Sequence, residues 1–296
     1  MRIMVSGGSG LIGSALVSLL EKSGNQVARL VRRNPANPSE VRWDPYGAID
    51  PSAFEGFDAV VHLAGENVAT RWTEAAKGRI QNSRVQGTQT IASSLARAVH
   101  RPAVLICASA VGYYGNRGEE ILTETSPPGS GFLAEVCRQW EAAAQPAVAA
   151  GIRTVLLRIG FVLSGKGGGL ARMLTPFRLG VGGRVGSGRQ WISWIALADV
   201  VASIQHVLAD IRLSGPVNVT APNPVTNSDF TSELGRALHR PALFPMPEFA
   251  VKLAFGEMGE ELLLTSQRAL PARLITAGYQ FRYPELGGAL KTALSE

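Results

Sequence analysis

The chain has 296 residues, enough to bury a full hydrophobic core in one large domain with a smaller addition. Hydrophobic residues make up 46% of the sequence and charged residues 18%, a balance that excludes a disordered chain. The formal net charge of +6 is compatible with an anionic cofactor. Its basic residues are scattered, so we expect an ordinary solvated surface and no nucleic-acid interface.

The start of the chain and its hydropathy pattern indicate where the protein works. Met1 leads directly into a predicted strand, so we expect no signal peptide, and no apolar run is long enough to span a membrane. Cys107 and Cys137 lie in apolar or helical segments and are predicted to be buried free thiols, as in a reducing compartment. These features favour a cytoplasmic protein with no membrane partner.

The first part of the chain predicts a complete strand–helix–strand unit. An apolar run at residues 2–6 predicts a buried strand that ends at glycine. Apolar residues then recur at helical spacing from Leu11 to Leu20, and Gly24 ends this helix. Residues 26–31 predict the second strand, so the unit closes at the length expected for two parallel strands joined by a helix.

Strands and helices continue to alternate up to about residue 160. Two helices are predicted, at residues 73–99 and 132–150, and Pro146 is expected to bend the last turn of the second. This alternation requires a parallel sheet with helices on both faces, so the predicted fold class is α/β, a Rossmann-like doubly wound sheet. The further predicted strands are residues 41–43, 58–63, 103–108 and 154–159.

The composition changes after residue 160. Residues 160–190 are rich in glycine and are predicted to form loops around a site, whereas residues 210–296 carry many prolines among short helices. We therefore expect a dinucleotide-binding core at residues 1–165, to which strands return from residues 190–220. Residues 166–296 would form a smaller C-terminal cap on the substrate side.

The stretch Gly7-Gly8-Ser9-Gly10-Leu11-Ile12-Gly13 follows the first strand and opens the first helix. In this context the glycines predict a phosphate cradle rather than a plain turn. Gly7 permits the tight turn, Gly10 lets a diphosphate approach the backbone, and Gly13 lets helix and strand pack closely. The free N–H groups and the positive end of the helix dipole would then face the anion.

The end of the second predicted strand favours NADP over NAD. An NAD-binding unit usually places an acidic residue there to bind the ribose hydroxyls, but this chain has Arg32 and Arg33 and no acid before Glu40. Guanidinium groups bind a 2′-phosphate, which a carboxylate would repel. The alternative is that both arginines are ordinary surface charges.

A second glycine-rich stretch, from Gly160 to Lys166, matches most of a P-loop. The next residue is Gly167 instead of the Ser or Thr that binds magnesium, so we do not predict a P-loop here. The four histidines are far apart and show no metal-ligand spacing, so no metal is predicted. His62 lies in a predicted buried strand and is expected to be a hydrogen-bonded core residue.

Several motifs resemble the extended short-chain dehydrogenase/reductase superfamily, beginning with GGSGLIG, DAVVHLAG and the strand-end Ser109. Longer stretches are similar to the atypical subgroup called epimerase family proteins, and the likeness covers nearly the whole chain. The resemblance implies a Rossmann-like core that binds NADP at the switch point of the sheet. These stretches are HLAGENVA, SAVGYYG, LRIGFVLSGKGGGL, GSGRQWISWIALAD and NVTAPNPVTN.

The resemblance also implies which residues contact the cofactor. Ser9 with Arg32 and Arg33 would hold the 2′-phosphate, and residues 63–65 would line the ribose and nicotinamide side. Glu66 and Arg84 would add polar contacts, and residues 161–162 would border the nicotinamide. The full implied set is Gly7, Ser9, Gly10, Leu11, Ile12, Gly13, Arg32, Arg33, Leu63, Ala64, Gly65, Glu66, Arg84, Phe161 and Val162.

The chain departs from the superfamily at its catalytic dyad. Typical members carry Tyr-x-x-x-Lys on a helix, where the lysine lowers the phenol pKa for proton transfer. One alignment puts Leu133 and Cys137 at these positions, and a shift by one residue puts Phe132 and Val136 there. The remaining candidates for a proton relay are Ser109, Tyr113 and Tyr114, although the two tyrosines are better explained as packing or substrate-stacking groups, because no lysine accompanies them to lower a phenol pKa.

Two functions therefore stay open. The first is an NADP(H)-dependent oxidoreductase or epimerase-like enzyme that acts on a small molecule of unknown identity. The second is a non-catalytic sensor or scaffold whose conformation depends on bound NADP(H). The missing dyad favours the second function and the glycine-rich site region favours the first. The oligomeric state is also open, with a homodimer as one alternative.

Overall fold

The computed structural model describes residues 1–295, and its centre is a seven-stranded parallel sheet in the order β11-β7-β5-β4-β1-β2-β3. Every pairing within this sheet is parallel, and the order reverses between β1 and β4, so the predicted α/β fold class is confirmed. The strands are β1 (Arg2–Ser6), β2 (Gln26–Val31), β3 (Glu40–Arg42), β4 (Ala59–His62), β5 (Val104–Ala110), β7 (Arg153–Ile159) and β11 (Gly215–Val219).

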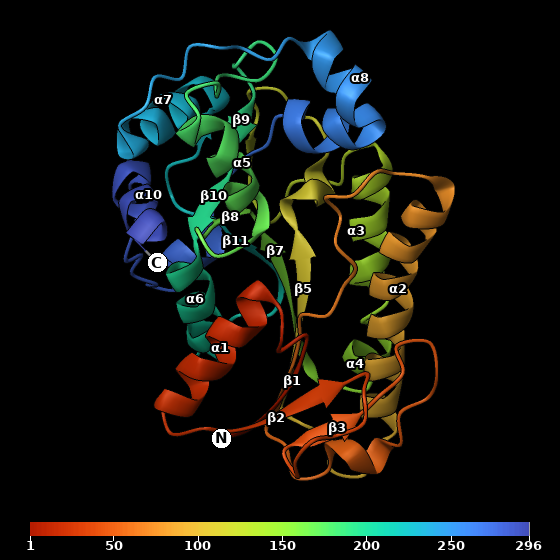
Figure 1. The fold of residues 1–296 in the computed structure, drawn as a ribbon. Coiled ribbons are helices and arrows are strands. Elements are labelled where there is room, and N and C mark those ends of the chain that lie inside the picture. The colour runs from red at the N-terminus through yellow and green to blue at the C-terminus, as the bar shows by residue number, and fades with distance from the viewer. Residues whose placement is uncertain (296) are drawn as a thin grey trace.

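Helices cover both faces of the sheet, as Figure 1 shows. Helices α1 (Leu11–Lys22) and α6 (Leu197–Ala209) pack on one face, and α2 (Glu74–Arg97), α3 (Phe132–Ala142) and α4 (Gln145–Ala149) pack on the other. The apolar faces of the central strands are almost completely buried between these two layers. Continuous apolar strands such as Val104–Ala110 follow from this arrangement, since both of their faces meet a helix.

Two predicted elements differ from the structure. The single helix predicted at residues 132–150 is two helices, α3 and α4, because Pro146 lies in the first turn of a new helix instead of inside the old one. The predicted loops at residues 160–190 contain β8 (Phe161–Leu163) and α5 (Gly168–Arg178). The buried residues of α5, Leu170, Leu174 and Phe177, are spaced as a helix face requires, but the glycines beside them hid this pattern.

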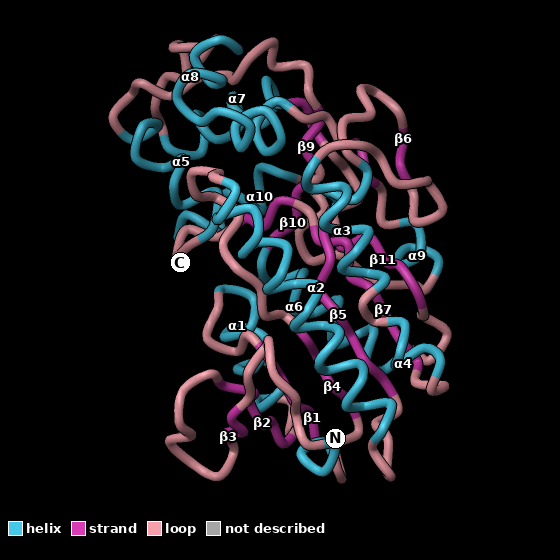
Figure 2. Tube along the Cα trace, turned by 90° about the vertical axis from the view of Figure 1, so that its right-hand side faces the viewer, coloured by secondary structure: helices cyan, strands magenta, loops and turns pink. Residues whose placement is uncertain are grey.

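The C-terminal elements gather at one end of the sheet, above the carboxyl end of β5 (Figures 1 and 2). Helices α5, α7 (Asn227–Leu238) and α10 (Leu286–Ser295) enclose a core of their own around Trp194 and Phe230. The domain boundary at residue 165 stays a prediction. The other elements of this region are β9 (Trp191–Ile192), β10 (Trp194–Ala196), β12 (Val225–Thr226), β13 (Arg268–Ala269), α8 (Glu248–Gly259) and α9 (Ala272–Thr276). The earlier short strand β6 (Ile121–Leu122) pairs with β13.

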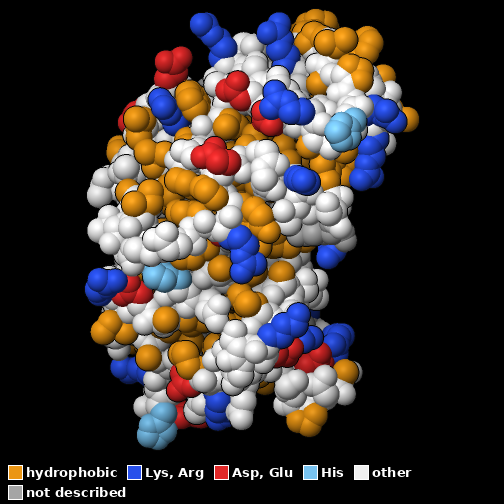
Figure 3. All heavy atoms as spheres, turned by 90° about the vertical axis from the view of Figure 1, so that its left-hand side faces the viewer, with side chains coloured by type: hydrophobic (Ala, Val, Ile, Leu, Met, Phe, Trp, Pro, Cys, Tyr) orange, Lys and Arg blue, Asp and Glu red, His pale blue; other side chains and the backbone are white. Residues whose placement is uncertain are grey.

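The surface and the helices show further features that bear on partners. No helix in the part of the chain that the structure describes combines the length and apolarity needed to cross a membrane. Figure 3 shows Lys and Arg side chains scattered over one face, with acidic side chains between them. Cys107 and Cys137 are buried free thiols, as predicted.

His62 is buried at the end of β4, as predicted for a core residue. Its Nδ1 lies 2.6 Å from Ser6 Oγ, and its ring packs edge-on against Trp43 with centroids 5.9 Å apart. Burial lowers the pKa of His62 from 6.5 to about 4. The folded protein therefore keeps this ring neutral down to a pH at which the unfolded chain already binds a proton.

We expect stability to fall as the pH drops below about 6.5, since the unfolded state then binds a proton that the folded state takes up only near pH 4. Between about pH 7.5 and about pH 5, the wild type should lose about 2 kcal/mol more than His62→Gln, which cannot titrate. Urea unfolding of both proteins at both pH values measures this difference. Equal losses in the two proteins would show that His62 does not carry the effect.

Candidate functional site

The glycine-rich turn between β1 and α1 leaves the start of a helix open. Gly10 is the N-cap of α1 and offers no side chain to it, and the first turn of α1 contains no acidic residue. The Gly10 N–H donates to the Gly7 carbonyl at 3.0 Å, which closes the turn beneath the helix start. The next backbone N–H groups have no partner inside their own helix, so they are free to bind an anion.

Close packing accounts for the glycines at both ends of the turn. A Cβ on Gly13 would come 2.1 Å from the Gly7 carbonyl oxygen, and a Cβ on Gly7 would come 2.8 Å from the Ala64 nitrogen. Gly7 also has a φ of +70°, which side-chain-bearing residues rarely adopt. Helix α1 therefore lies directly against β1 and the residues after β4, and the residues present fit a bound diphosphate.

An open pocket of about 530 Å³ lies beside the turn. Lys166 and Gly167 line it together with Ser9 and Gly10. The neighbouring Gly168 lies close to α1, and a Cβ there would come within 3.3 Å of Leu11 Cδ2. The missing side chain therefore permits this close approach. The P-loop-like stretch is thus part of the same site as the first glycine turn. Sequence reasoning missed Lys166 because it treated the stretch only as a separate phosphate site.

The two arginines after β2 lie in different environments. Arg32 is exposed, and no hydrogen bond or ion pair within residues 1–295 involves its side chain. Arg33 instead binds Glu40 with both of its terminal nitrogens, at 2.8 and 2.6 Å. Glu40 is buried and also accepts a hydrogen bond from the Ala36 N–H, and these bonds hold its pKa below the ordinary value.

Arg33 is therefore part of the loop that joins β2 to β3. This placement speaks against the predicted contact of Arg33 with a 2′-phosphate, because a phosphate would have to displace the buried Glu40 carboxylate. The sequence signal for this ion pair was an arginine and a glutamate seven residues apart, on either side of a proline-containing turn. Arg32 is left as the arginine available to a ligand at this strand end.

The residues after β4 and β7 lie along the same edge of the sheet. Leu63, like Ile12 and Val162, packs against the apolar core between the sheet and α1. The Glu66 N–H donates to Ser83 Oγ at 3.0 Å, which fixes the loop after Gly65 to α2. Phe161 packs on Phe230 with ring centroids 5.8 Å apart, so its ring belongs in large part to the core of the C-terminal region.

Two of the three predicted proton-relay residues are enclosed. Ser109 is 2% exposed, and its Oγ donates to Glu141 Oε1 at 2.7 Å. Tyr114 is fully buried, and burial raises the pKa of its hydroxyl. This hydroxyl lies 2.7 Å from Asn218 Oδ1 and accepts a hydrogen bond from Arg158. These contacts speak against the predicted relay roles of Ser109 and Tyr114, since neither hydroxyl is free to meet a substrate.

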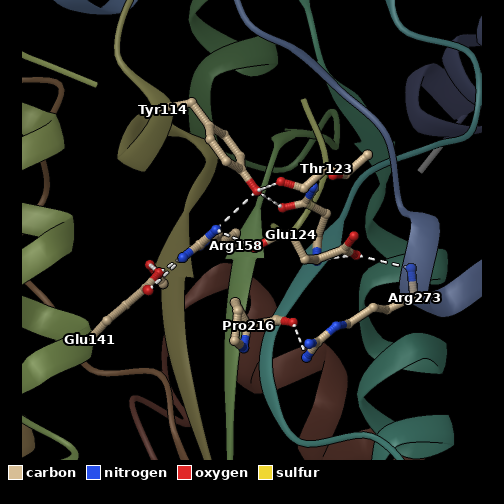
Figure 4. A network of polar contacts seen from close by, with 9 residues as sticks. Tyr114, Thr123, Glu124, Glu141, Arg158, Pro216 and Arg273 are labelled. Carbon is tan, nitrogen blue, oxygen red and sulfur yellow. Dashed lines mark hydrogen bonds and ion pairs between the residues drawn. The ribbon is translucent and has the colours of Figure 1, made fainter. Parts of the chain in front are cut away.

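Arg158 on β7 is the centre of a network that joins elements far apart in the sequence (Figure 4). Its guanidinium binds both carboxylate oxygens of Glu141, each at 2.8 Å. Burial alone would lower the pKa of Arg158, but the contacts with Glu141 outweigh it and raise that pKa. The ring of Tyr113 stacks 3.5 Å from the guanidinium carbon. Tyr113 is half-buried and is thus the most accessible of the three predicted relay residues.

The network continues to the C-terminal elements. Glu124 Oε1 accepts hydrogen bonds from the N–H groups of Asn218 and Arg273, both at 3.1 Å. The Arg273 side chain donates to the Pro216 carbonyl at 2.9 Å. Residues on α3, β7, β11 and α9 are therefore fixed to one another, and Figure 4 shows these side chains converging between the strands. We interpret the network as structural support for this end of the sheet.

Comparisons with known proteins identify the family. The sequence profile described as "NAD dependent epimerase/dehydratase family" matches residues 3–220, more than half of the chain. The chain belongs to this family. A second profile, described as a domain of unknown function, matches residues 246–293, which include α8, α9 and most of α10.

Relatives in the epimerase family are similar along their whole length. Epimerase family protein Mb2239 of Mycobacterium bovis is 48% identical over 290 residues, which is 97% of this chain and 96% of the relative. Epimerase family protein SDR39U1 of Homo sapiens is 38% identical over 295 residues, 98% of this chain and 99% of the relative. The crystal structure of human SDR39U1 (isoform 2) with NADPH has a TM-score of 0.91 at 36% identity, covering 100% and 99% of the chains.

The helix on which the superfamily dyad is expected is α3. A Cβ on Gly112, in the turn after β5, would lie 3.5 Å from Leu133 Cβ and 3.7 Å from Cys137 Sγ. This pair faces the strand end, as the first of the two alignments requires. The second alignment, through Phe132 and Val136, places Phe132 against Trp72, with ring centroids 4.9 Å apart.

Proposed function

We propose that this chain binds NADP(H) and catalyses hydride transfer or an epimerase-like reaction on a small molecule. The observation that carries the proposal is the open start of α1 above a turn in which Gly7 and Gly13 leave no room for a side chain, with the unpaired Arg32 after the neighbouring strand. The human relative crystallised with NADPH supports it. The two free thiols support a cytoplasmic location, which we also propose.

The residues of the site divide by their place along the sheet. The N–H groups at the start of α1 would hold the diphosphate, assisted by Lys166. Ser9 and Arg32 would hold the 2′-phosphate near β2, and the backbone of residues 63–65 would line the other half of the cofactor. When bound, NADP(H) accepts or donates a hydride. The chain would position that group at the edge of the sheet.

We expect Arg32→Glu to raise the Kd for NADPH about 10- to 100-fold and to change the Kd for NADH less than about 3-fold, because only NADPH carries the 2′-phosphate that Arg32 pairs with. Titration of intrinsic fluorescence or calorimetry with both cofactors measures the two constants. Arg79→Glu, at an exposed position on α2, makes the same change in net charge and serves as the control. Equal weakening of NADPH and NADH would defeat the assignment.

A second function is favoured by the state of the proton-relay residues. Ser109 and Tyr114 are enclosed, and no tyrosine in the sequence is followed by lysine four residues later. A sensor that binds NADP(H) without turnover would have this combination. Oxidation of NADPH is therefore tested against a panel of carbonyl compounds and nucleotide sugars. Turnover that drops in Tyr113→Phe supports the enzyme, whereas saturable NADPH binding without any turnover supports the sensor.

A further inference from the structure

Large apolar side chains lie in the open at the end of the molecule that carries α8. Six such residues there are each more than half exposed. Figure 3 shows hydrophobic side chains gathered near the top of the molecule, the end at which α8 lies in Figure 1. Contiguous apolar patches on a protein surface mark sites of interaction. We call this set the α8 patch, and its members are Leu179, Val181, Leu243, Phe244, Phe249 and Leu253.

The two chain segments that contribute to the α8 patch lie side by side. The Phe244 N–H donates to the Gly182 carbonyl at 3.3 Å, and the Met246 N–H donates to the Arg184 carbonyl at 2.9 Å. These bonds join the segment that follows α5 to the segment that leads into α8. The patch is therefore one continuous surface, although its members are about 70 residues apart in the sequence.

The apolar face of α8 points outward from a helix that is held in place. Val251 is completely buried, and Phe249 and Leu253 stand two residues before and after it. At about 100° per residue, both lie about 160° around the helix from Val251, on its outer side. On the inner side, Lys77 Nζ donates to both carboxylate oxygens of Glu257 at 3.0 Å. The exposed apolar face is thus a fixed part of the fold.

Opposite charges flank the α8 patch. Arg178 and Arg240 are exposed, and no ion pair in the part of the chain that the structure describes includes either of them. Arg240 Nε donates to the Arg178 carbonyl at 3.2 Å, so the two residues lie together. On α8, Lys252 is shared by Glu248 at 2.8 Å and Glu260 at 3.3 Å, which leaves an excess of negative charge there.

We propose that the α8 patch is the interface of a homodimer, in which a second copy of this chain covers it across a two-fold axis. In a two-fold interface each patch meets itself, so the cations of one copy would face the carboxylates of the other. The six side chains expose on the order of 500 Å². That area is a large part of the roughly 800 Å² that each partner buries in a stable complex.

The charges favour a second copy over a membrane. Apolar residues beside arginines would also fit an anionic lipid surface. The carboxylates of α8 would be repelled by such a surface, whereas a second copy offers them cations. The inference goes beyond the proposed function and does not depend on cofactor binding.

Analytical ultracentrifugation of the full chain between about 1 and about 100 µM measures the association. We expect a dimer with a Kd in the micromolar range. Leu253→Glu should raise this Kd at least about 10-fold, because it places a charge in a buried apolar contact. Val99→Glu is the matched control, since Val99 is 84% exposed and Leu253 86%, and Val99 lies outside the patch, just after α2. This control should dimerise like the wild type.

Reversal of one flanking charge tests the second part of the proposal. Arg240→Glu should raise the Kd of the dimer about 5- to 10-fold, because an attraction between the copies becomes a repulsion. Arg101→Glu makes the same change in net charge at another exposed arginine. Both arginines donate one side-chain hydrogen bond to a backbone carbonyl, so the two variants lose similar contacts within the chain. Equal dimerisation of both variants would contradict the predicted charge pairing.

Three results would overturn the interface. One is a wild type that stays monomeric at about 100 µM, and another is a dimer that Leu253→Glu leaves intact. The third is a monomer that binds vesicles of phosphatidylcholine and phosphatidylserine and loses this binding in Leu253→Glu, which would assign the patch to a membrane. Should Leu253→Glu not fold, as judged by circular dichroism, Phe249→Ser decides by the same criteria.

Discussion

Replacing Glu141 by alanine is expected to lower the free energy of unfolding by about 3–5 kcal/mol, with a fall in Tm on the order of 10 °C. The side chains of Arg158 and Glu141 are 3% and 10% exposed, so removal of the carboxylate leaves a buried guanidinium without its counter-charge. The hydroxyl of Ser109 also loses its acceptor. Urea or thermal unfolding measures the loss.

A matched control lies on the same helix. Arg138 and Glu135 on α3 also form a two-bond ion pair, but their side chains are 54% and 47% exposed, so Glu135→Ala should cost far less. The double variant Glu141→Leu/Arg158→Met should lose less stability than the sum of the losses in its two single variants, since no unpaired charge remains. If Glu141→Ala is no less stable than Glu135→Ala, the network does not support the sheet as we infer.

Cofactor affinity separates the structural reading of this network from a catalytic one. In the structure Glu141 contacts Ser109 and Arg158, and none of these contacts reaches the glycine turn. Glu141→Ala should therefore bind NADPH with nearly unchanged affinity at a temperature where it is folded. The contact with Glu141 also explains why Ser109 was a misleading candidate. The local sequence around a serine at a strand end does not distinguish one that faces a substrate from one that faces a buried glutamate.

The core of the fold was predictable because its signals are local. The glycine turn, the apolar strands and the helical period of α1 each lie within a short window, and they set the parallel sheet without long-range information. Where two signals competed, the prediction was wrong. Glycines obscured the buried face of α5, and Pro146 was taken to bend a helix although it starts the next one.

The site was less predictable because its partners are far apart in sequence. Tyr114 is enclosed by Asn218, 104 residues later, and Ser109 by Glu141, 32 residues later. Arg84 meets Gly65 only because α2 packs back along the sheet. No periodicity or spacing encodes these contacts. They follow from the packing of whole elements, which the sequence pattern specifies only after the topology is known.

Gly13→Val is expected to abolish measurable NADPH binding, a loss of more than about 1,000-fold, because it displaces the start of α1 from the cradle. The added Cβ would meet the Gly7 oxygen at 2.1 Å, the Gly7 carbon at 2.8 Å and the Gly8 Cα at 2.9 Å, all of them backbone atoms that cannot move alone. Overpacking of this kind also costs about 1–3 kcal/mol of stability. Calorimetry with NADPH and thermal unfolding of the free protein measure the two effects.

Two other glycines separate damage to the cradle from damage to the fold. A Cβ on Gly10 would meet only the Gly7 oxygen, at 3.4 Å, so Gly10→Ala should fold and yet bind NADPH more weakly, because its methyl group faces the diphosphate. Gly78→Ala on α2 meets no atom within 4 Å and should bind like wild type. If Gly13→Val folds and still binds NADPH normally, the diphosphate does not lie at the start of α1. The assignment of Arg32 to the 2′-phosphate would then fail with it.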